Sequence, residues 1–154
     1  MKLERVKVKS LKHDPINARK HSERNIEAIR GSLDAFGQQR PLVVWRGIVI
    51  AGNGTLQAAK ELDWDEIEIV RAPDSWSSDE ARAYSLADNR TSELAEWDDK
   101  LLADQLLELD SVGFDIGDWG FSTLVPPLDP EPPNDPFVKA VTCPDCGLEF
   151  VPNN

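Results

Sequence analysis

Two glycines flank an asparagine directly after an apolar, β-branched run, in the segment Ala51-Gly52-Asn53-Gly54-Thr55. Glycines allow a sharp turn with accessible backbone amides, and the start of a following helix adds a partial positive charge. Together these features predict an anion site that takes a phosphate. Any tight strand-to-helix connection can show the same pattern, with Thr55 only as the helix cap. The segment matches neither the dinucleotide fingerprint nor the Walker lysine motif.

A second group of candidates surrounds the first long helix and is mainly basic: Asn17, Arg19, Lys20, His21 and Arg40. Planar guanidinium groups bind phosphate oxygens in pairs. Arg40 lies immediately before the strand that leads into the hairpin, so it could face the glycine segment that follows the hairpin. The alternative is that these residues only solvate a helix end, and for His21 a surface or capping role is the more common one.

Cys143 and Cys146 form a Cys-Pro-Asp-Cys-Gly knuckle, typical of one half of a zinc ribbon. A structural Zn²⁺ takes four ligands, and the chain has 2 cysteines. His13 and His21 could complete the site only if the tail folded over the domain, whereas two tails could form a four-cysteine Zn²⁺ site across a homodimer. A reduced, metal-free tail or a remnant of a longer protein is the alternative. The thioredoxin-like context that a redox pair needs is missing.

The hydrophobic pattern predicts the elements that position these candidates. In chain order it indicates a strand over 5–8, a helix over 22–36, a hairpin of strands 42–45 and 48–50, a helix after the glycine segment and a strand over 67–70. Ser22 can cap the first helix and Gly37 can end it. The hairpin has little polar alternation, so we expect it to be buried on both faces.

Two further helices and a tail follow. Ser77 and Glu80 form a capping box for a helix that runs to about Arg90, and Asp98 caps a helix that ends near Gly113. We expect the inner side of the last helix to carry Leu101, Leu102, Leu106 and Leu109. These elements divide the chain into a domain over 3–71, a helical extension over 72–121, a proline-rich linker over 122–139 and a tail over 140–154 that contains the cysteine knuckle.

Charge is spread unevenly along the chain. The net charge is −11, yet residues 1–46 hold 11 Lys and Arg against 5 Asp and Glu. The overall charge argues against a histone-like or polybasic role. The basic part could face an anionic ligand, and the acidic part could repel or mimic nucleic acid or hold a basic partner, unless both are simply solvated surface. Without a signal peptide or an apolar run long enough to span a membrane, we expect a cytoplasmic protein.

The order of these segments resembles the ParB/sulfiredoxin superfamily, specifically its ParB-like N-terminal, nuclease-like domain. Over residues 3–71 the resemblance depends on Asn17-Ala18-Arg19, on Phe-Gly-Gln-Gln-Arg-Pro-Leu-Val-Val at 36–44, on Ile-Ala-Gly-Asn-Gly-Thr-Leu-Gln-Ala-Ala-Lys at 50–60 and on 67–70. Residues 82–90, 96–98 and 113–115 are similar to the helical extension of ParB-like domains found in phages and beside DNA methyltransferases. The resemblance implies an α+β fold, a small mixed sheet with packed helices.

In that family the loop after the hairpin binds the phosphates of a nucleotide. The resemblance therefore implies CTP or ATP with Mg²⁺ as the ligand, and a phosphate-binding role for Gly52, Asn53, Gly54, Thr55, Arg40, Arg19 and Asn17. The chain reads Gly-Asn-Gly-Thr-Leu-Gln-Ala where partition ParB proteins read G-E-R-R-x-R-A, and Asn53 and Thr55 replace the His and Arg of the methyltransferase-linked group. These departures count against triphosphate hydrolysis. The sulfiredoxin cysteine motif is absent, which counts against peroxiredoxin repair.

Three functions fit this pattern. The first is a nucleotide-binding module in DNA metabolism, a switch or weak phosphotransferase that lacks its own DNA-reading domain and works with DNA or with a DNA-modification or partition protein. The second is a non-catalytic adaptor that uses its acidic helices, including 93–110, to hold a partner. The third is a metal-dependent nuclease, for which the carboxylates of the basic part show no clear paired arrangement.

Overall fold

The computed structural model describes residues 2–122, 141–142 and 149–150. Residues 1–123 and 124–154 form two compact units. The first unit contains, in chain order, β1 (Leu3–Lys7), a 3₁₀ turn η1 (Val8–Ser10), β2 (Lys12–His13), α1 (Glu23–Phe36), β3 (Leu42–Trp45), β4 (Ile48–Ala51), α2 (Asn53–Glu61), β5 (Glu66–Arg71), α3 (Ser78–Glu93), α4 (Asp99–Ser111) and η2 (Ile116–Trp119). The expected α+β fold class is confirmed.

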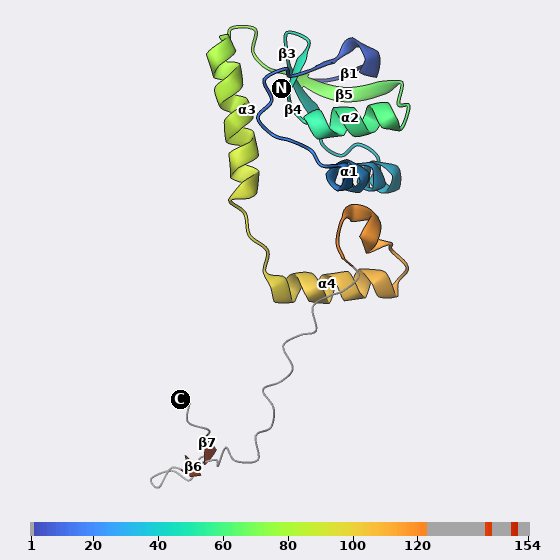
Figure 1. Ribbon diagram of the computed structural model, residues 1–154, viewed down its shortest axis with the longest axis vertical. Coiled ribbons are helices and arrows are strands. Elements are labelled where there is room, and N and C mark those ends of the chain that lie inside the picture. Colours follow the sequence, from blue (N-terminus) through green and yellow to red (C-terminus); the bar gives the residue numbers. More distant parts are fainter. Residues whose placement is uncertain (1, 123–140, 143–148, 151–154) are drawn as a thin grey trace. The chain divides into compact units, whose positions relative to one another are not determined.

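Five strands form one mixed sheet in the order β1-β5-β3-β4-β2, and Figure 1 labels four of them, β1, β3, β4 and β5. The pairs β1/β5 and β3/β4 are antiparallel, whereas β3/β5 and β2/β4 are parallel. Arg46 and Gly47 form the predicted hairpin turn, and both have positive φ angles, 48° and 84°. Two positive φ angles match the twist of adjacent strands in a two-residue turn. The short strand β2 was not predicted, because two residues cannot establish an alternating pattern.

Alternate residues of β3 belong to two different hydrophobic clusters. Leu42 and Val44 pack in the cluster that contains Leu56 of α2, whereas Val43 and Trp45 pack with Ala81 of α3. Successive side chains of a strand point to opposite faces, so the sheet lies between these two helices. The prediction that the hairpin is buried on both faces is therefore confirmed, and α1 packs in turn against α2 (Figure 1).

The predicted caps at the starts of α1, α3 and α4 and the predicted end of α1 are confirmed, whereas α3 extends to Glu93, beyond the expected end at about Arg90. Ser22 accepts a hydrogen bond from the backbone of Asn25, Ser77 and Glu80 form a complete capping box, and Asp98 caps α4. Side-chain oxygens at these positions satisfy backbone N–H groups that lack a partner within the helix. Gly37 ends α1 with a φ of 67°.

The prediction that Leu101 lies on the inner side of α4 is wrong. Leu101 is 54% exposed, whereas Leu106 is 8% exposed, and Leu102 and Leu109 are partly buried. Adjacent residues lie about 100° apart around a helix. The inward-facing side of α4 is narrow and carries Leu102, Leu106 and Leu109. Leu101 lies next to this side and is exposed.

The chain returns from α4 to α1 through η2. A Cβ atom on Gly31, in the middle of α1, would overlap the backbone carbonyl of Asp118. Arg24 of α1 donates a hydrogen bond to the Gly120 carbonyl at 3.1 Å, and the rings of Phe36 and Trp119 lie 5.1 Å apart. These contacts anchor the end of the helical extension to α1.

In the second unit, β6 (Val141–Thr142) and β7 (Glu149–Phe150) form an antiparallel pair. Cys143 and Cys146 lie outside the described residues, as do residues 123–139 of the linker, so the Zn²⁺ site and the homodimer that it implies stay predictions. A search of the described residues finds no helix that is long and apolar enough to cross a membrane.

Candidate functional site

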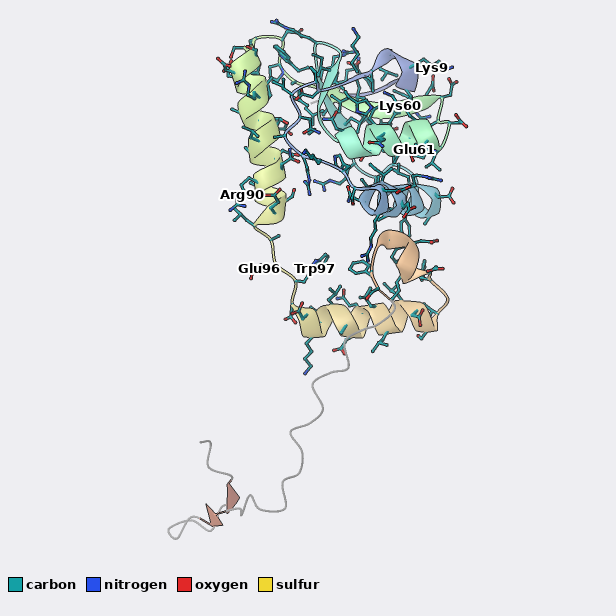
Figure 2. All side chains as sticks on the ribbon, viewed as in Figure 1. Lys9, Lys60, Glu61, Arg90, Glu96 and Trp97 are labelled. Atoms are coloured by element: carbon teal, nitrogen blue, oxygen red, sulfur yellow. The ribbon has the colours of Figure 1, made fainter. Side chains whose placement is uncertain are left out.

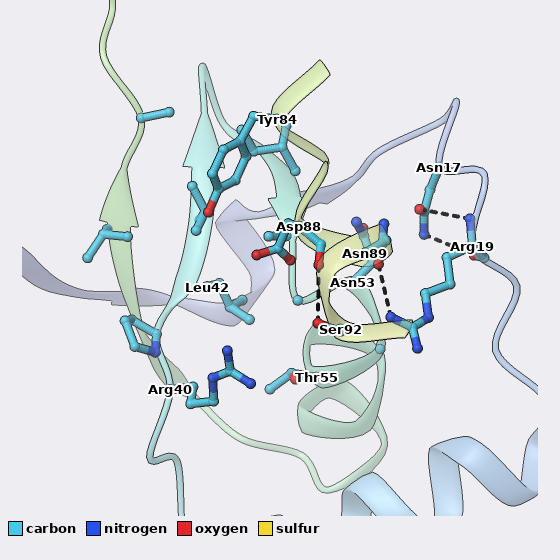
Figure 3. Close-up of a pocket in the computed structure, with 18 of the residues that line it drawn as sticks. Asn17, Arg19, Arg40, Leu42, Asn53, Thr55, Tyr84, Asp88, Asn89 and Ser92 are labelled. Atoms are coloured by element: carbon cyan, nitrogen blue, oxygen red, sulfur yellow. Dashed lines mark hydrogen bonds between the residues drawn. The ribbon is translucent and has the colours of Figure 1, made fainter. Parts of the chain in front are cut away.

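A cavity of about 760 Å³ lies where α2 begins, with β3 and β4 on one side and α3 on the other (Figure 3). This volume is typical of sites for small ligands. All of the residues proposed from the sequence as phosphate ligands line it: Asn17, Arg19, Arg40, Gly52, Asn53, Gly54 and Thr55. His21 lines it as well, whereas Lys20 does not. The fold thus brings the glycine segment and most of the basic group to one place.

The connection from β4 to α2 is shorter than the sequence suggests. Gly52 alone is the N-cap, with a φ of 92°, and Asn53, Gly54 and Thr55 already form the first turn of α2. A Cβ atom on Gly52 would lie 2.5 Å from Cδ2 of Leu42. The first N–H groups of a helix have no partner within the helix, and glycine has no side chain to cap them. This first turn therefore presents backbone donors at the cavity.

The Asn53 side chain serves the fold. The residue is 9% exposed, its Nδ2 donates to the Val49 carbonyl at 2.8 Å, and its Oδ1 accepts from the backbone N–H of Asp14 at 3.1 Å. Both ends of the amide are thus engaged within the fold, which leaves the backbone N–H of Asn53 as the donor that the first helical turn offers to a ligand.

The packing around Gly54 leaves no room for a side chain at this position. A Cβ atom there would lie 2.8 Å from Cε1 of His21 and 2.8 Å from Cδ1 of Ile29. A larger residue at this position would disturb the packing of α2 against α1 and the preceding loop. A substitution of Gly54 is consequently a poor test of phosphate binding, because it changes the fold as well.

Two arginines approach the cavity from different segments. Arg40 is exposed, and its guanidinium points toward the start of α2 near Thr55 (Figure 3). Arg19 donates through Nη1 to Oδ1 of Asn89 on α3 at 3.1 Å. Asn17 binds both the N–H and the carbonyl of Arg19, at 3.2 and 3.1 Å. Asn17 therefore fixes the loop that carries Arg19.

Sequence reasoning missed the contribution of α3. Tyr84, Asp88, Asn89 and Ser92 all line the cavity (Figure 3). Burial and the nearby Asp88 carboxylate raise the pKa of the Tyr84 hydroxyl, and the Arg40 guanidinium opposes this shift. Polar residues spaced four apart at 84, 88 and 92 share one helix face, and this spacing was the available signal.

The polar and aromatic parts of the cavity follow one another along α3. Trp76 packs against Tyr84 with ring centroids 5.4 Å apart, next to Ala72 and Ile50. Arg19 reaches α3 at Asn89, more than one helical turn beyond Tyr84. An elongated ligand with an anionic end and a flat apolar end matches this order.

No protein-family model matches the chain, and no curated protein matches its sequence. Among solved structures, the C-terminally truncated chromosome-partitioning protein ParB from Caulobacter crescentus, complexed with CTP-γ-S, aligns with a TM-score of 0.63 at 15% identity, over 71% of this chain and 63% of that one. The chain has a ParB-like fold. The pNOB8-like ParB N-domain aligns with a TM-score of 0.50 at 21% identity, over 72% of this chain and 44% of that one.

This chain therefore spans less than two thirds of each of these two ParB chains. Sulfiredoxin from Arabidopsis thaliana aligns at 14% identity with a TM-score of 0.45, over 56% of this chain and 98% of that one. The relation to ParB-like domains of phages or methyltransferase operons stays a prediction. Within the described residues, no group of three or more His, Cys, Asp or Glu could hold a metal ion by itself.

Proposed function

We propose that the ParB-like domain binds a nucleotide in the cavity between α2 and α3, and that it serves as a nucleotide-binding module in DNA metabolism. The observation that carries this proposal is the convergence of the first turn of α2, Arg19 and Arg40 on one cavity that also has an aromatic wall. Helix starts and guanidinium groups are two common means by which proteins bind phosphate.

The phosphates would lie at the start of α2. There the backbone N–H groups of Asn53, Gly54 and Thr55 are the donors, and the positive end of the helix dipole favours an anion. Arg40 would bind the phosphates from the β3 side and Arg19 from the α3 side. Arg71 also lines the cavity, but its Nε donates to the Glu4 carboxylate at 2.9 Å, which leaves it less available.

The base and ribose would extend toward Trp76 and Tyr84. Aromatic faces stack on nucleobases, and Tyr84 also offers a hydroxyl to a polar edge. CTP is the first ligand to test, because the ParB chain with a TM-score of 0.63 was crystallised with CTP-γ-S; ATP is the second.

Asp88 fits a role in holding Mg²⁺. A lone carboxylate in a cavity that takes phosphates repels them unless a cation lies between the two. Mg²⁺ is commonly bound by one or two protein carboxylates together with the phosphates of a nucleotide. Asp88 and the nucleotide would hold the ion jointly, and the ion would neutralise phosphate charge that two arginines leave uncompensated.

Calorimetric titration with CTP, ATP, GTP and ADP, with and without Mg²⁺ at physiological salt, tests the proposal. We expect saturable binding of at least one nucleotide, and about tenfold weaker binding by Arg40→Ala, because one charge-assisted hydrogen bond contributes about 1.5–3 kcal/mol. Arg82→Ala is the matched control, since Arg82 is exposed on α3 outside the cavity. Absence of binding under all of these conditions would overturn the proposal.

A specific surface feature favours an adaptor role as the second candidate. Trp97, between α3 and α4 (Figure 2), is 70% exposed. Leu94 is 62% exposed. Acidic residues surround them in the sequence, including Glu93, Glu96 and Asp98. An exposed apolar group with an acidic rim suits a basic, amphipathic segment of another protein. Titration with a synthetic Lys/Leu helical peptide tests this role, which fails if Trp97→Ser binds the peptide as well as wild type does.

A further inference from the structure

His21 lies against the first turn of α2, inside the cavity. Its Cε1 and Nδ1 atoms would be 2.8 and 3.0 Å from a Cβ atom on Gly54, the second residue of the helix. The imidazole therefore borders the backbone donors that the proposed phosphate site uses. The residue is partly buried, and it lines the same cavity as Arg19 and Arg40.

A hydrogen bond of the His21 ring determines which of its nitrogens carries hydrogen in the neutral form. Nδ1 lies 2.6 Å from Oδ1 of Asn25, so Nδ1–H donates to this amide oxygen. A neutral imidazole with hydrogen on Nδ1 carries a lone pair on Nε2. For Nε2 of His21, the described part of the chain provides no hydrogen-bond partner. At Nε2 the neutral ring thus carries an acceptor, and only the protonated ring carries a donor.

We propose that His21 is a ligand of the nucleotide phosphates through Nε2–H, and that phosphate binding is accompanied by protonation of this imidazole. The inference rests on the proposed nucleotide site and adds a residue and a proton to it. One proton moves from solvent to Nε2, and no bond of the nucleotide changes. Histidine is suited to this role because its charge ordinarily changes between pH 5 and pH 8.

The groups around His21 determine the direction of the effect. A phosphate bound beside the ring favours a positive charge on it. The α1 neighbours Asn25 and Ile29 are uncharged. The other titratable groups that face this region are His13 on β2, which interacts electrostatically with His21, and Tyr84 and Asp88 across the cavity. Nucleotide affinity is therefore expected to increase as pH falls.

Proton uptake upon binding separates this role from a merely structural one. CTP with Mg²⁺ is titrated into the protein at pH 7 in two buffers with different ionisation enthalpies. We expect wild type to take up about 0.5 proton per nucleotide more than His21→Gln, and to gain about fivefold more affinity between pH 8 and pH 6. Protonation of the nucleotide itself is common to both proteins and cancels in the difference. His13→Gln is the control and is expected to retain the uptake, because His13 does not line the cavity.

Each outcome is decisive. Equal proton uptake by wild type and His21→Gln overturns the inference but leaves the nucleotide site intact. If wild type binds ATP and not CTP, the same comparison is made with ATP, and absence of binding of all four nucleotides overturns both proposals. If His21→Gln fails to fold, NMR titration of the two histidines in wild type replaces it. The His21 ring is then expected to titrate at a higher pH when CTP is bound, and an unchanged midpoint contradicts the inference.

Discussion

The side-chain oxygen of Asn53 accepts a hydrogen bond from the backbone N–H of Asp14 at 3.1 Å. This contact joins the first residue of α2 to the segment that leaves β2, 39 positions earlier in the chain. The same side chain also donates to the carbonyl of Val49 within β4. One amide therefore holds together three segments that surround the cavity.

Asn53→Ala should destabilise the domain by about 2–3 kcal/mol, because it leaves the Asp14 N–H and the Val49 carbonyl without their partner. Urea unfolding measures the change. Thr55→Ala, two residues further along the same helical turn, is the control, and its free energy of unfolding should stay within about 0.5 kcal/mol of wild type. Equal stability of wild type and Asn53→Ala would show that water replaces the amide.

Asp88→Asn should remove most of the Mg²⁺ dependence of nucleotide binding. In EDTA the variant should bind CTP at least as tightly as wild type, because the carboxylate no longer repels the phosphates. Calorimetry with and without Mg²⁺ measures both effects. Asp104→Asn on α4 provides a control outside the cavity. A variant that retains the full Mg²⁺ effect would exclude Asp88 as a ligand of the ion.

Arg19→Ala should weaken CTP binding about tenfold while the free energy of unfolding changes by less than about 0.5 kcal/mol, since the contact from Arg19 to Asn89 is exposed. Asn17→Ala should cause a smaller loss of affinity, about threefold, because it leaves the guanidinium in place but frees its loop. If Asn17→Ala has the larger effect, Asn17 itself contacts the ligand.

Gly31→Ala tests the contact between α1 and η2 through the sign of the stability change. Helix propensity alone predicts that alanine stabilises the helix by about 1 kcal/mol. The overlap of a Cβ atom with the Asp118 carbonyl predicts the opposite, a loss of about 1–3 kcal/mol together with greater exposure of Trp119. Thermal unfolding and tryptophan fluorescence measure both, with Ser32→Ala as the exposed control. A stabilised Gly31→Ala would show that η2 does not pack closely here.

Stability should fall as pH decreases from about 7.5 to 5.5 because of His13. Partial burial, and then the Lys60 ammonium, lower the pKa of His13 in the folded protein. The unfolded chain, with the ordinary value of 6.5, therefore binds more protons in this window, so the stabilisation present above pH 6.5 is lost below it. Urea unfolding at both pH values should show a smaller pH dependence for His13→Gln. An unchanged dependence would assign the effect to other groups.

Local signals predict the elements well, because they involve only neighbouring residues. The caps at Ser22, Ser77 and Asp98 and the turn at Arg46-Gly47 each depend on fewer than five consecutive residues. Leu101 shows the limit of this approach: the spacing of leucines identifies a helix, but the width of its buried side depends on what packs against it. Among the described elements, η2 packs against α4 and contributes to defining that side.

The part of the candidate site formed by segments close together in the sequence could be predicted. The part formed by α3 could not. The glycine segment and Arg40 are connected by one hairpin, which places them close together. Asp88 and Tyr84 reach the same cavity from a helix that begins after β5, and their contribution depends on how α3 lies across the sheet. At Gly54 the sequence could not distinguish two reasons for a glycine. A small residue allows a phosphate to approach the backbone, and it also allows His21 to pack against the helix.

The two-sided burial of β3 also limits how the protein can be dissected. A fragment that ends at residue 71, where the sequence pattern suggests a domain boundary, would lack the helix that covers Val43, Trp45 and Ile50. Such a fragment would expose a continuous apolar sheet surface to water, and exposed surfaces of this kind promote self-association. Aggregation of the short fragment would therefore not indicate an unstable sheet. Soluble expression should require the chain to extend through α3, and a shorter recombinant product would be unsuitable for crystallisation or binding assays.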